Sequence, residues 1–455
     1  MRRGGFSVQD RRVLVVGAAR SGVAAAEMLA RRGAIVTLTD VRDTVDAAGR
    51  LRAAGIALEL GGHRTETFAA ADLIVASPGV PLAQPVFEAA RQRGTEIIGE
   101  LELASRWILG RIIAVTGTKG KSTTTTLIGR MLDAAGRKAL LGGNIGVPLS
   151  THVDASTPES VHVVETSSFQ LETTTTFHPW IAVWLNFADD HLDRHPSIES
   201  YAAAKARIFV NQTADDWAVI NADDPTVMTH SRRAAARKVQ FALSGRISDG
   251  FVVDGDWIVR RTTTGAERLF PVAAVELTGR HMLNNVLAAT AAASLAGCSP
   301  EALAAALRGF HGLEHVMEPA GEIRGVRFVN DSKATNVEAA RRSIESFSRG
   351  VVAIIGGYFK GGDLAQLREP LSAVGKAVIA IGEATPLVHD ALNGVVPVID
   401  AASMREAVER GYSAADAGGV VLLAPACASF DWFRDYAERG NTFKNEVRRL
   451  KGQVE

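Results

Sequence analysis

The feature that most constrains the fold is a glycine-bearing loop between an apolar run and a helical pattern. The run at residues 112–115 is typical of a buried strand, and apolar residues at helical spacing follow residue 123. The chain between them reads Gly117, Thr118, Lys119, Gly120, Lys121, Ser122 and Thr123. Strand, loop and helix in this order predict a phosphate-binding loop, because backbone N–H groups at the start of a helix converge on anionic oxygens.

In such a loop Lys121 would face the β- and γ-phosphates of ATP, and the hydroxyl of Ser122 or Thr123 could ligate Mg²⁺. The two glycines lie closer together than in the usual spacing of this loop, and a Gly-Lys-Ser string also arises by chance. The flanking strand and helix nevertheless favour an ATP site.

Length, charge and cysteine content narrow the class of protein. A chain of 455 residues suggests about three domains. Because Lys plus Arg and Asp plus Glu are both 50, we expect no attraction to nucleic acid or to an anionic membrane. The two cysteines, Cys298 and Cys427, predict neither disulfides nor a metal site, and no apolar run approaches the roughly 18 residues of a membrane span. We therefore expect a cytoplasmic protein without a membrane span.

A second glycine turn lies between two expected strands at residues 13–40. Strand, turn, helix and a strand ending at Asp40 outline a dinucleotide fingerprint. Its middle glycine is replaced by Ala19, which hinders close approach of a pyrophosphate. We therefore expect a Rossmann-like domain that holds another nucleotide or a sugar nucleotide, with Asp40 as a ribose or base contact. The alternatives are NAD binding and a purely structural role of Gly17 and Gly22.

Acidic residues follow two expected strands of the next segment. Glu165 ends the first strand, and the second, at residues 181–186, leads to Asp189, Asp190, His191 and Asp193. Since carboxyl ends of parallel strands meet at one edge of a sheet, Glu165 predicts a Mg²⁺ site beside the phosphate loop. His191 and its acidic neighbours predict a second site, for a cation or a phosphate, at the same edge. Solvated loop acids are the alternative. Lys205, in a helix expected at residues 201–208, has the local pattern of a surface lysine.

The last segment alternates strands and helices, which predicts a doubly wound, mostly parallel sheet. The whole chain is therefore expected to be an α/β protein of three domains. These are a Rossmann-like domain at 1–100, a central P-loop ATPase-type domain with a mostly parallel sheet at 101–312, and a C-terminal doubly wound domain at 313–455.

Several motifs, in order along nearly the whole chain, resemble those of the Mur ligase family. They are the phosphate loop from Gly117, Gly-Asn-Ile-Gly from Gly143, Glu-Thr-Ser-Ser-Phe-Gln-Leu-Glu from Glu165, Asn-Ala-Asp-Asp from Asn221, Gly-Arg-His-Met-Leu-Asn-Asn from Gly279, Asn-Asp-Ser-Lys-Ala-Thr-Asn from Asn330, Ser-Phe-Asp-Trp-Phe from Ser429 and Arg-Gly-Asn from Arg439.

This resemblance implies a reaction of peptidoglycan precursor synthesis. ATP would phosphorylate the carboxylate of UDP-N-acetylmuramoyl-L-alanine to an acyl phosphate, and the amino group of D-glutamate would attack it, with release of ADP and phosphate. The alternatives are the same ligation with L-glutamate, a folylpolyglutamate ligase of the same superfamily, and an NAD-dependent oxidoreductase. We expect a monomer.

The resemblance also implies roles for individual residues. The UDP moiety would contact Ser21, Asp40 and Arg42. Mg²⁺ would be held by Ser122, Thr123, Glu165, His191 and a carbamylated Lys205. Asn144 and His191 would hold the muramoyl-alanine end. Asn285 and Asp331 would approach the adenine and ribose of ATP. D-Glutamate would be received by Lys333, Thr335, Lys360 and Ser429, with Tyr436 nearby.

The chain departs from the family pattern at two positions. Val316 stands where relatives usually carry an arginine, and valine offers no donor to an anion. Tyr436 stands where relatives often carry phenylalanine. We expect the first change to remove a γ-phosphate or nucleotide contact.

Overall fold

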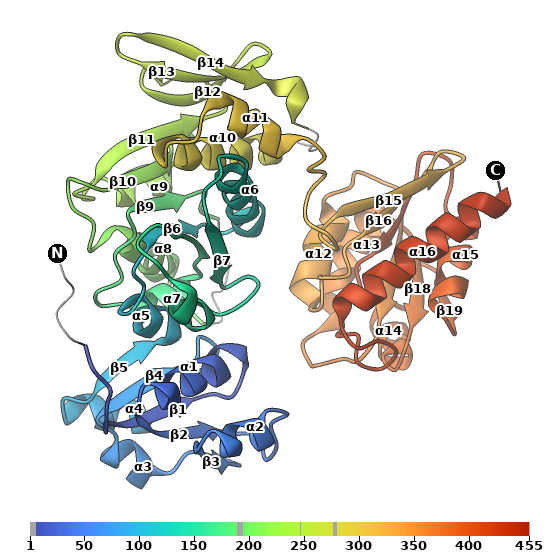
Figure 1. Cartoon of the computed structure of the whole chain (residues 1–455). Coiled ribbons are helices and arrows are strands. Elements are labelled where there is room, and N and C mark those ends of the chain that lie inside the picture. The colour runs from blue at the N-terminus through green and yellow to red at the C-terminus, as the bar shows by residue number, and fades with distance from the viewer. Residues whose placement is uncertain (1–5, 189–193, 246, 276–279, 455) are drawn as a thin grey trace. The chain divides into compact units, whose positions relative to one another are not determined.

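The computed structural model describes residues 6–188, 194–245, 247–275 and 280–454. The chain divides into two compact units, unit 1 up to Phe310 and unit 2 from His311 (Figure 1). No helix of the described ranges is long and apolar enough to cross a membrane.

The first sheet of unit 1 is parallel and has the order β3-β2-β1-β4-β5. Its strands are β1 (Arg12–Val16), β2 (Ile35–Asp40), β3 (Ala57–Leu60), β4 (Leu73–Ala76) and β5 (Glu96–Gly99). Its helices are α1 (Arg20–Arg31), α2 (Ala48–Ala53), α3 (Thr65–Ala70) and α4 (Pro85–Gln92). The β1–α1–β2 unit confirms the expected Rossmann-like start.

The second sheet of unit 1 has the order β14-β13-β12-β11-β10-β9-β6-β8-β7 and is parallel except for the β12–β13–β14 meander. Its strands are β6 (Arg111–Thr116), β7 (Ala139–Gly143), β8 (Val161–Glu165), β9 (Ile181–Trp184), β10 (Trp217–Asn221), β11 (Arg237–Ala242), β12 (Gly250–Asp254), β13 (Trp257–Thr262) and β14 (Gly265–Pro271). Its helices are α5 (Glu100–Ser105), α6 (Lys121–Ala134), α7 (Ser168–Glu172), α8 (Ile198–Ala206), α9 (Pro225–His230), α10 (Arg280–Leu295) and α11 (Pro300–Leu307).

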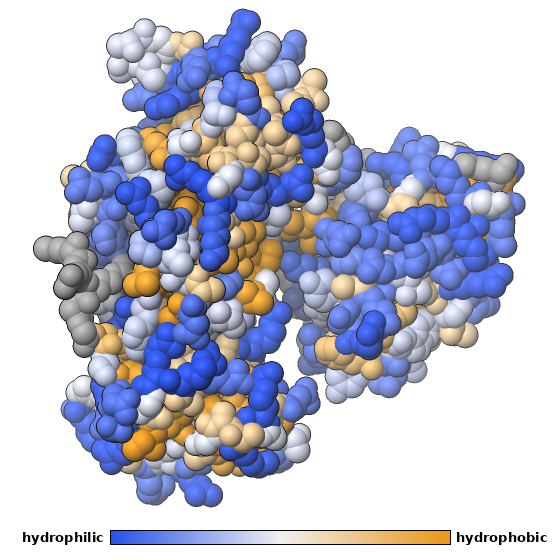
Figure 2. Space-filling model, viewed as in Figure 1, coloured by the Kyte–Doolittle hydropathy of each residue, from blue (hydrophilic) through white to orange (hydrophobic). Residues whose placement is uncertain are grey.

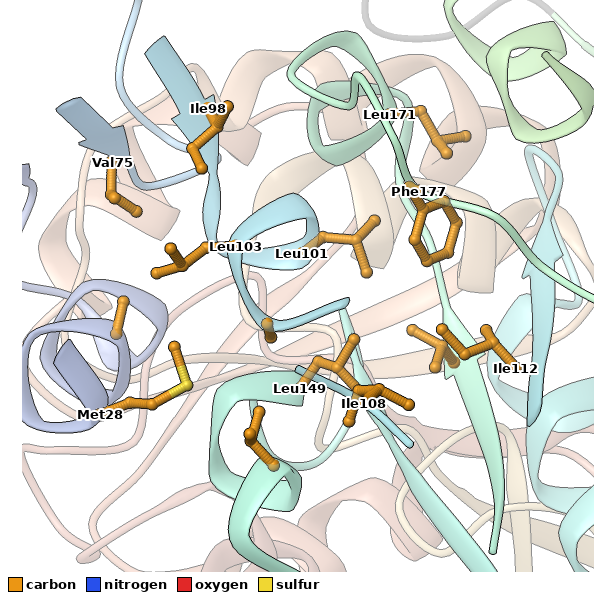
Figure 3. Close-up of a cluster of buried hydrophobic side chains, with 14 of the residues drawn as sticks. Met28, Val75, Ile98, Leu101, Leu103, Ile108, Ile112, Leu149, Leu171 and Phe177 are labelled. Atoms are coloured by element: carbon orange, nitrogen blue, oxygen red, sulfur yellow. The ribbon is translucent and has the colours of Figure 1, made fainter. Parts of the chain in front are cut away.

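Helix α5 joins the two sheets of unit 1 into one hydrophobic core. In Figure 3 Leu103 points from α5 toward Val75 and Met28, whereas Leu101 points toward Phe177 and Leu171. All six residues belong to one buried cluster. Full burial of a leucine contributes about 1.5–3 kcal/mol, so α5 stabilises both sheets at once. The expected division near residue 100 falls at the start of this helix, and the domain boundaries of unit 1 stay a prediction.

Unit 2 has one sheet of order β15-β16-β20-β17-β18-β19, parallel except for β15. Its strands are β15 (Glu318–Ile323), β16 (Val326–Asn330), β17 (Val351–Gly356), β18 (Gly375–Ile381), β19 (Val398–Ala401) and β20 (Val420–Leu423). Its helices are α12 (Val337–Glu345), α13 (Arg368–Val374), α14 (Thr385–Leu392), α15 (Met404–Ala414) and α16 (Tyr436–Val454).

Helices cover both faces of this sheet, so the expected doubly wound fold is confirmed. Helices α12, α13 and α14 share one buried cluster with the sheet, and α15 and α16 share another. Phe443, Val447 and Leu450 of α16 are buried at helical spacing. The outer side of α16 is hydrophilic (Figure 2).

Candidate active site

The phosphate loop joins β6 to α6 as the sequence predicts. Gly117 and Gly120 have φ angles of 156° and 81°, which a side chain would strain. A Cβ at Gly120 would lie 2.1 Å from Oδ1 of Asn285, so this glycine is needed for packing as well. Nζ of Lys121 donates to the carbonyl oxygens of Gly117 at 3.0 Å and Thr118 at 2.9 Å. The lysine ammonium is therefore held over its own loop.

Glu165 lies beside the first turn of α6, because β8 and β6 are neighbours in the sheet. Its side chain is 2% exposed and accepts hydrogen bonds from Ser122 Oγ at 2.7 Å and from Asn144 Nδ2 at 2.6 Å. Thr123, the next residue of α6, is buried. A carboxylate and hydroxyls are hard oxygen donors, and Mg²⁺ is usually bound by one or two carboxylates together with substrate phosphates and water. The residues present therefore fit this ion.

His191 is the other residue that is expected to bind both the metal ion and the substrate. His191, with Asp189, Asp190 and Asp193, lies outside the described residues, and its two roles stay predictions. Within the described ranges, no cluster of three His, Cys, Asp or Glu side chains could hold a metal ion.

Lys205 is buried next to the phosphate loop. Its side chain is 1% exposed, and Nζ donates to the carbonyl oxygen of Gly117 at 2.9 Å and lies 4.5 Å from the centre of the Tyr201 ring. The surface position that the helix pattern predicts is wrong, because α8 buries Tyr201, Ala204 and Lys205 against the rest of unit 1. Its role as a metal ligand stays a prediction.

Asn186, just past β9, is a loop-shaping residue that the sequence did not single out. Its Oδ1 accepts from the backbone N–H groups of Thr118 at 3.1 Å and Lys119 at 2.9 Å, and its Nδ2 donates to the carbonyl of Lys119 at 3.0 Å. The signal was a polar residue at the end of a strand adjacent to β6. Asn285, buried on α10, lies against Gly120. Its contact with adenine stays a prediction.

The expected UDP contacts lie at the carboxyl ends of β1 and β2. Asp40 accepts from the backbone N–H of Ala18 at 2.6 Å, and its two oxygens accept from Nε and Nη2 of Arg42, both at 2.9 Å. The hydrogen bonds from Arg42 hold the pKa of Asp40 well below its usual range. Arg42 keeps a side-chain exposure of 54%, so its guanidinium remains accessible to a ligand. Ser21, half-buried, is the second residue of α1.

Packing accounts for both glycines of this turn. Gly17 has a φ angle of 94°, and a Cβ at Gly22 would lie 1.8 Å from the Gly17 carbonyl oxygen. The structural role of Gly17 and Gly22, left open by the sequence, is therefore supported.

A cavity of about 200 Å³ lies between the end of β4 and α7. It is lined by Ser77, Pro78, Val80, Phe169, Glu172 and Arg194, among others. The Arg194 guanidinium donates to the carbonyl of Gly79 at 3.2 Å and lies 4.8 Å from the Phe169 ring centre. The sequence did not predict a site role for Arg194, because the contact joins two segments far apart in the chain.

In unit 2 the expected glutamate-binding residues lie on three loops at one edge of the sheet. Lys333 and Thr335 follow β16, Lys360 follows β17 and Ser429 follows β20; β20 lies between the other two strands. The loops are hydrogen bonded to each other through Ala426 and Ala334, and through Tyr358 and Ala428. Lys360 is exposed, Lys333 and Thr335 are half-buried, and Ser429 is buried. Tyr436, at the start of α16, is 40% exposed.

Arg439 of α16 ties two of these loops together, which the sequence did not predict. Its buried guanidinium donates to Ser332 Oγ at 3.0 Å, to the Ser332 carbonyl at 2.9 Å, and to the carbonyls of Cys427 and Ala428, both at 3.1 Å. Burial lowers the pKa of Arg439 to about 10. The residue therefore stays charged at neutral pH.

Asp331 and Val316 lie near the start of unit 2. Asp331 accepts from the backbone N–H of Met317 at 3.1 Å and from the Ser343 hydroxyl, and burial raises its pKa. Val316 is half-buried between His315 and Met317, whose φ angles are 63° and 45°. The ribose contact of Asp331 and the effect of Val316 stay predictions.

The fold and this site define a phosphate-loop α/β enzyme. Comparison with known families matches residues 11–99 to "Mur ligase MurD-like, N-terminal domain", 115–293 to "Mur ligase middle domain" and 317–427 to "Mur ligase, glutamate ligase domain". The chain belongs to the Mur ligase family and is a ligase.

Curated relatives match over nearly the whole chain. A protein of Acidobacterium capsulatum named UDP-N-acetylmuramoylalanine--D-glutamate ligase is 47% identical over 98% of both chains. A protein of Desulfosudis oleivorans with the same name is 44% identical over 97% of both.

Among solved structures, UDP-N-acetylmuramate-alanine ligase from Thermotoga maritima is 17% identical, with a TM-score of 0.55 over 97% of this chain and 100% of that one. At this identity the likeness concerns the fold alone.

Proposed function

We propose that this chain is an ATP-dependent ligase that joins D-glutamate to UDP-N-acetylmuramoyl-L-alanine in peptidoglycan precursor synthesis. The observation that carries the proposal is the meeting of Ser122, Glu165 and Asn144 at the phosphate loop. The nearly full-length match to relatives that are named for this activity supports the choice of substrates.

The chemistry of the site is mainly charge stabilisation. ATP supplies a phosphoryl group that turns the substrate carboxylate into an acyl phosphate, and Mg²⁺ would neutralise the phosphate oxygens. Lys121 and the N–H groups at the start of α6 stabilise developing negative charge in a fixed arrangement. Glu165 and the Ser122 hydroxyl would hold the ion, and Asn144, which is bonded to Glu165, would offer its remaining polar atoms to the acceptor.

Lys205 contributes to the same site as a carbamate. Carbamylation by CO₂ forms an N–C bond, releases a proton and turns the ammonium side chain into a carboxylate-like ligand. The reaction needs the neutral amine, which burial and a second lysine on the same carbonyl oxygen both favour. The contact of Lys205 with the Gly117 carbonyl, in the phosphate loop, supports a position for this ligand near the proposed Mg²⁺ site.

The amino-acid substrate is assigned to the loops of unit 2. Lys333 and Lys360 supply cations for the two carboxylates of glutamate, and Thr335 and Ser429 supply hydroxyl groups. We further propose that the protein acts as a cytoplasmic monomer with both cysteines reduced; both are free and buried.

The proposal is tested by measuring ADP release in mixtures from which one component is omitted. ADP should form only when ATP, Mg²⁺, UDP-N-acetylmuramoyl-L-alanine and glutamate are all present. Glutamate-dependent ADP release without the UDP acceptor would show that the assigned acceptor is wrong.

A further inference from the structure

Residues 185–188, which follow β9, are hydrogen bonded on one side to the phosphate loop and on the other side to the turn that follows β10. Asn186 binds the backbone N–H groups of Thr118 and Lys119, as described above. Ala188 donates to Thr118 Oγ1 at 3.1 Å, and the same hydroxyl donates back to the Ala188 carbonyl at 3.2 Å. The even-numbered residues of 185–188 are therefore attached to the phosphate loop.

The odd-numbered residues are attached to the turn that follows β10, and Leu185 also donates its backbone N–H to the carbonyl of Thr116, the last residue of β6, at 3.0 Å. Nδ2 of Asn221 donates to the carbonyl of Leu185 at 2.8 Å, and Oδ2 of Asp224 accepts from the backbone N–H of Phe187 at 2.6 Å. Strands β6 and β10 flank β9 in the sheet, so the segment is held between them.

Asp224 divides its two oxygens between two tasks. Oδ1 caps α9 by accepting from the N–H groups of Thr226 at 3.0 Å and Val227 at 3.1 Å, while Oδ2 holds Phe187. Asp223 next to it serves another loop, since its Oδ2 accepts from Leu243 N at 2.7 Å and Ser244 N at 3.2 Å. Asp224 therefore contacts residues 185–188, which hold the phosphate loop, whereas the neighbouring carboxylate of Asp223 does not.

We propose that Asp224 is a positioning residue for nucleotide binding. Through the Phe187 amide it fixes residues 185–188, and these fix the backbone of the phosphate loop at Thr118 and Lys119. A hydrogen bond to a charged carboxylate is stronger than one between neutral groups. Such a contact is suited to keeping the phosphate loop in one conformation when a nucleotide binds. The inference rests on the proposed function, because it takes this loop as the ATP site.

Asp224→Asn isolates the contact, with Asp223→Asn as its matched control. Asparagine at 224 keeps an oxygen for the α9 cap but turns a donor NH₂ group toward the Phe187 N–H. We expect the Kd of a fluorescent ATP analogue with Mg²⁺ to rise about tenfold in Asp224→Asn and to stay within about twofold in Asp223→Asn. The KM for UDP-N-acetylmuramoyl-L-alanine should change less than the KM for ATP in Asp224→Asn.

Asn221→Asp is a second probe if Asp224→Asn does not fold. It keeps the oxygen that accepts from the Asp223 N–H and removes the donor to Leu185, so it should also weaken nucleotide binding. If the wild type binds the analogue and a folded Asp224→Asn protein binds it equally well, the inference fails while the proposed function stands. If the wild type does not bind the analogue, both fail.

Discussion

Two lysine side chains, Lys121 and Lys205, donate to the single carbonyl oxygen of Gly117. One comes from the phosphate loop itself and the other from α8, far along the chain. Two cations at one acceptor repel each other, so conversion of one of them to an anionic carbamate would relieve the repulsion.

Lys121→Ala should lower kcat by about a hundredfold or more, because it removes a fixed positive charge from phosphoryl transfer. The measurement is ADP release at saturating substrates, with a thermal melt to confirm folding. Lys138→Ala is the control, since Lys138 is exposed and its Nζ donates to the Ala155 carbonyl at 3.3 Å, away from the phosphate loop. Undiminished turnover in a folded Lys121→Ala protein would exclude this loop from catalysis.

Lys205→Ala should also lose activity, and millimolar acetate or formate should restore part of it by supplying the missing carboxylate. Chloride at the same ionic strength serves as the control. A variant with full activity, or one that acetate and chloride affect equally, would contradict the carbamate.

We expect the buried side chain of His162 to make the folded protein less stable at acid pH. Burial holds its pKa at about 4, compared with 6.5 for an exposed histidine, and His152 and Lys138 add positive charge nearby. Between these values the unfolded chain binds a proton that the folded chain does not, so the free energy of unfolding should fall by up to about 3 kcal/mol as pH drops from 6.5 to 4. Denaturant titrations of unit 1 at several pH values measure this, and His162→Gln should flatten the slope. If the free energy of unfolding depended on pH equally in the wild type and in His162→Gln, His162 would not be the cause of the acid destabilisation.

At the scale of the element, short helix α5 holds together two sheets. Leu101→Ala should lower the free energy of unfolding by about 2–5 kcal/mol, because it leaves a cavity in the shared core. Leu109→Ala is the control: Leu109 is 66% exposed and should change stability by less than about 0.5 kcal/mol. Equal effects of the two substitutions in chemical denaturation would show that α5 does not carry the core.

The sequence predicts elements well where a strand is buried on both faces. The runs of β1, β6 and β17 are continuously apolar because helices cover both sides of the sheet. Strand β15 is different: it is an antiparallel edge strand with Pro319, Gly321 and a register shift, and most of it is exposed or half-buried. It therefore lacks the apolar run on which the prediction depends.

At the scale of the whole molecule, site residues are predictable when they follow a strand and unpredictable when they are defined by partners. Glu165 ends β8 and Asn144 follows β7, and the topology of the sheet brings both to the phosphate loop. Lys205 and Arg439 owe their positions to contacts between distant segments. Local patterns carry no information on such contacts, and only the family resemblance indicated the burial of Lys205.

The two units carry different parts of the proposed chemistry. Unit 1 contains the phosphate loop with Ser122 and Glu165, and unit 2 contains the loops with Lys333 and Lys360. This division follows the three family matches, of which the last is a glutamate ligase domain. We therefore propose that unit 1 carries out phosphoryl transfer and that unit 2 recognises the amino acid.

The most direct test of this account is coupled ADP release with UDP-N-acetylmuramoyl-L-alanine and a panel of D- and L-amino acids. We predict that D-glutamate gives the highest kcat/KM and that the product gains the mass of one glutamate residue. A higher kcat/KM for L-glutamate would contradict the stereochemical assignment, and acceptor-dependent ADP release without glutamate addition would contradict the ligase itself.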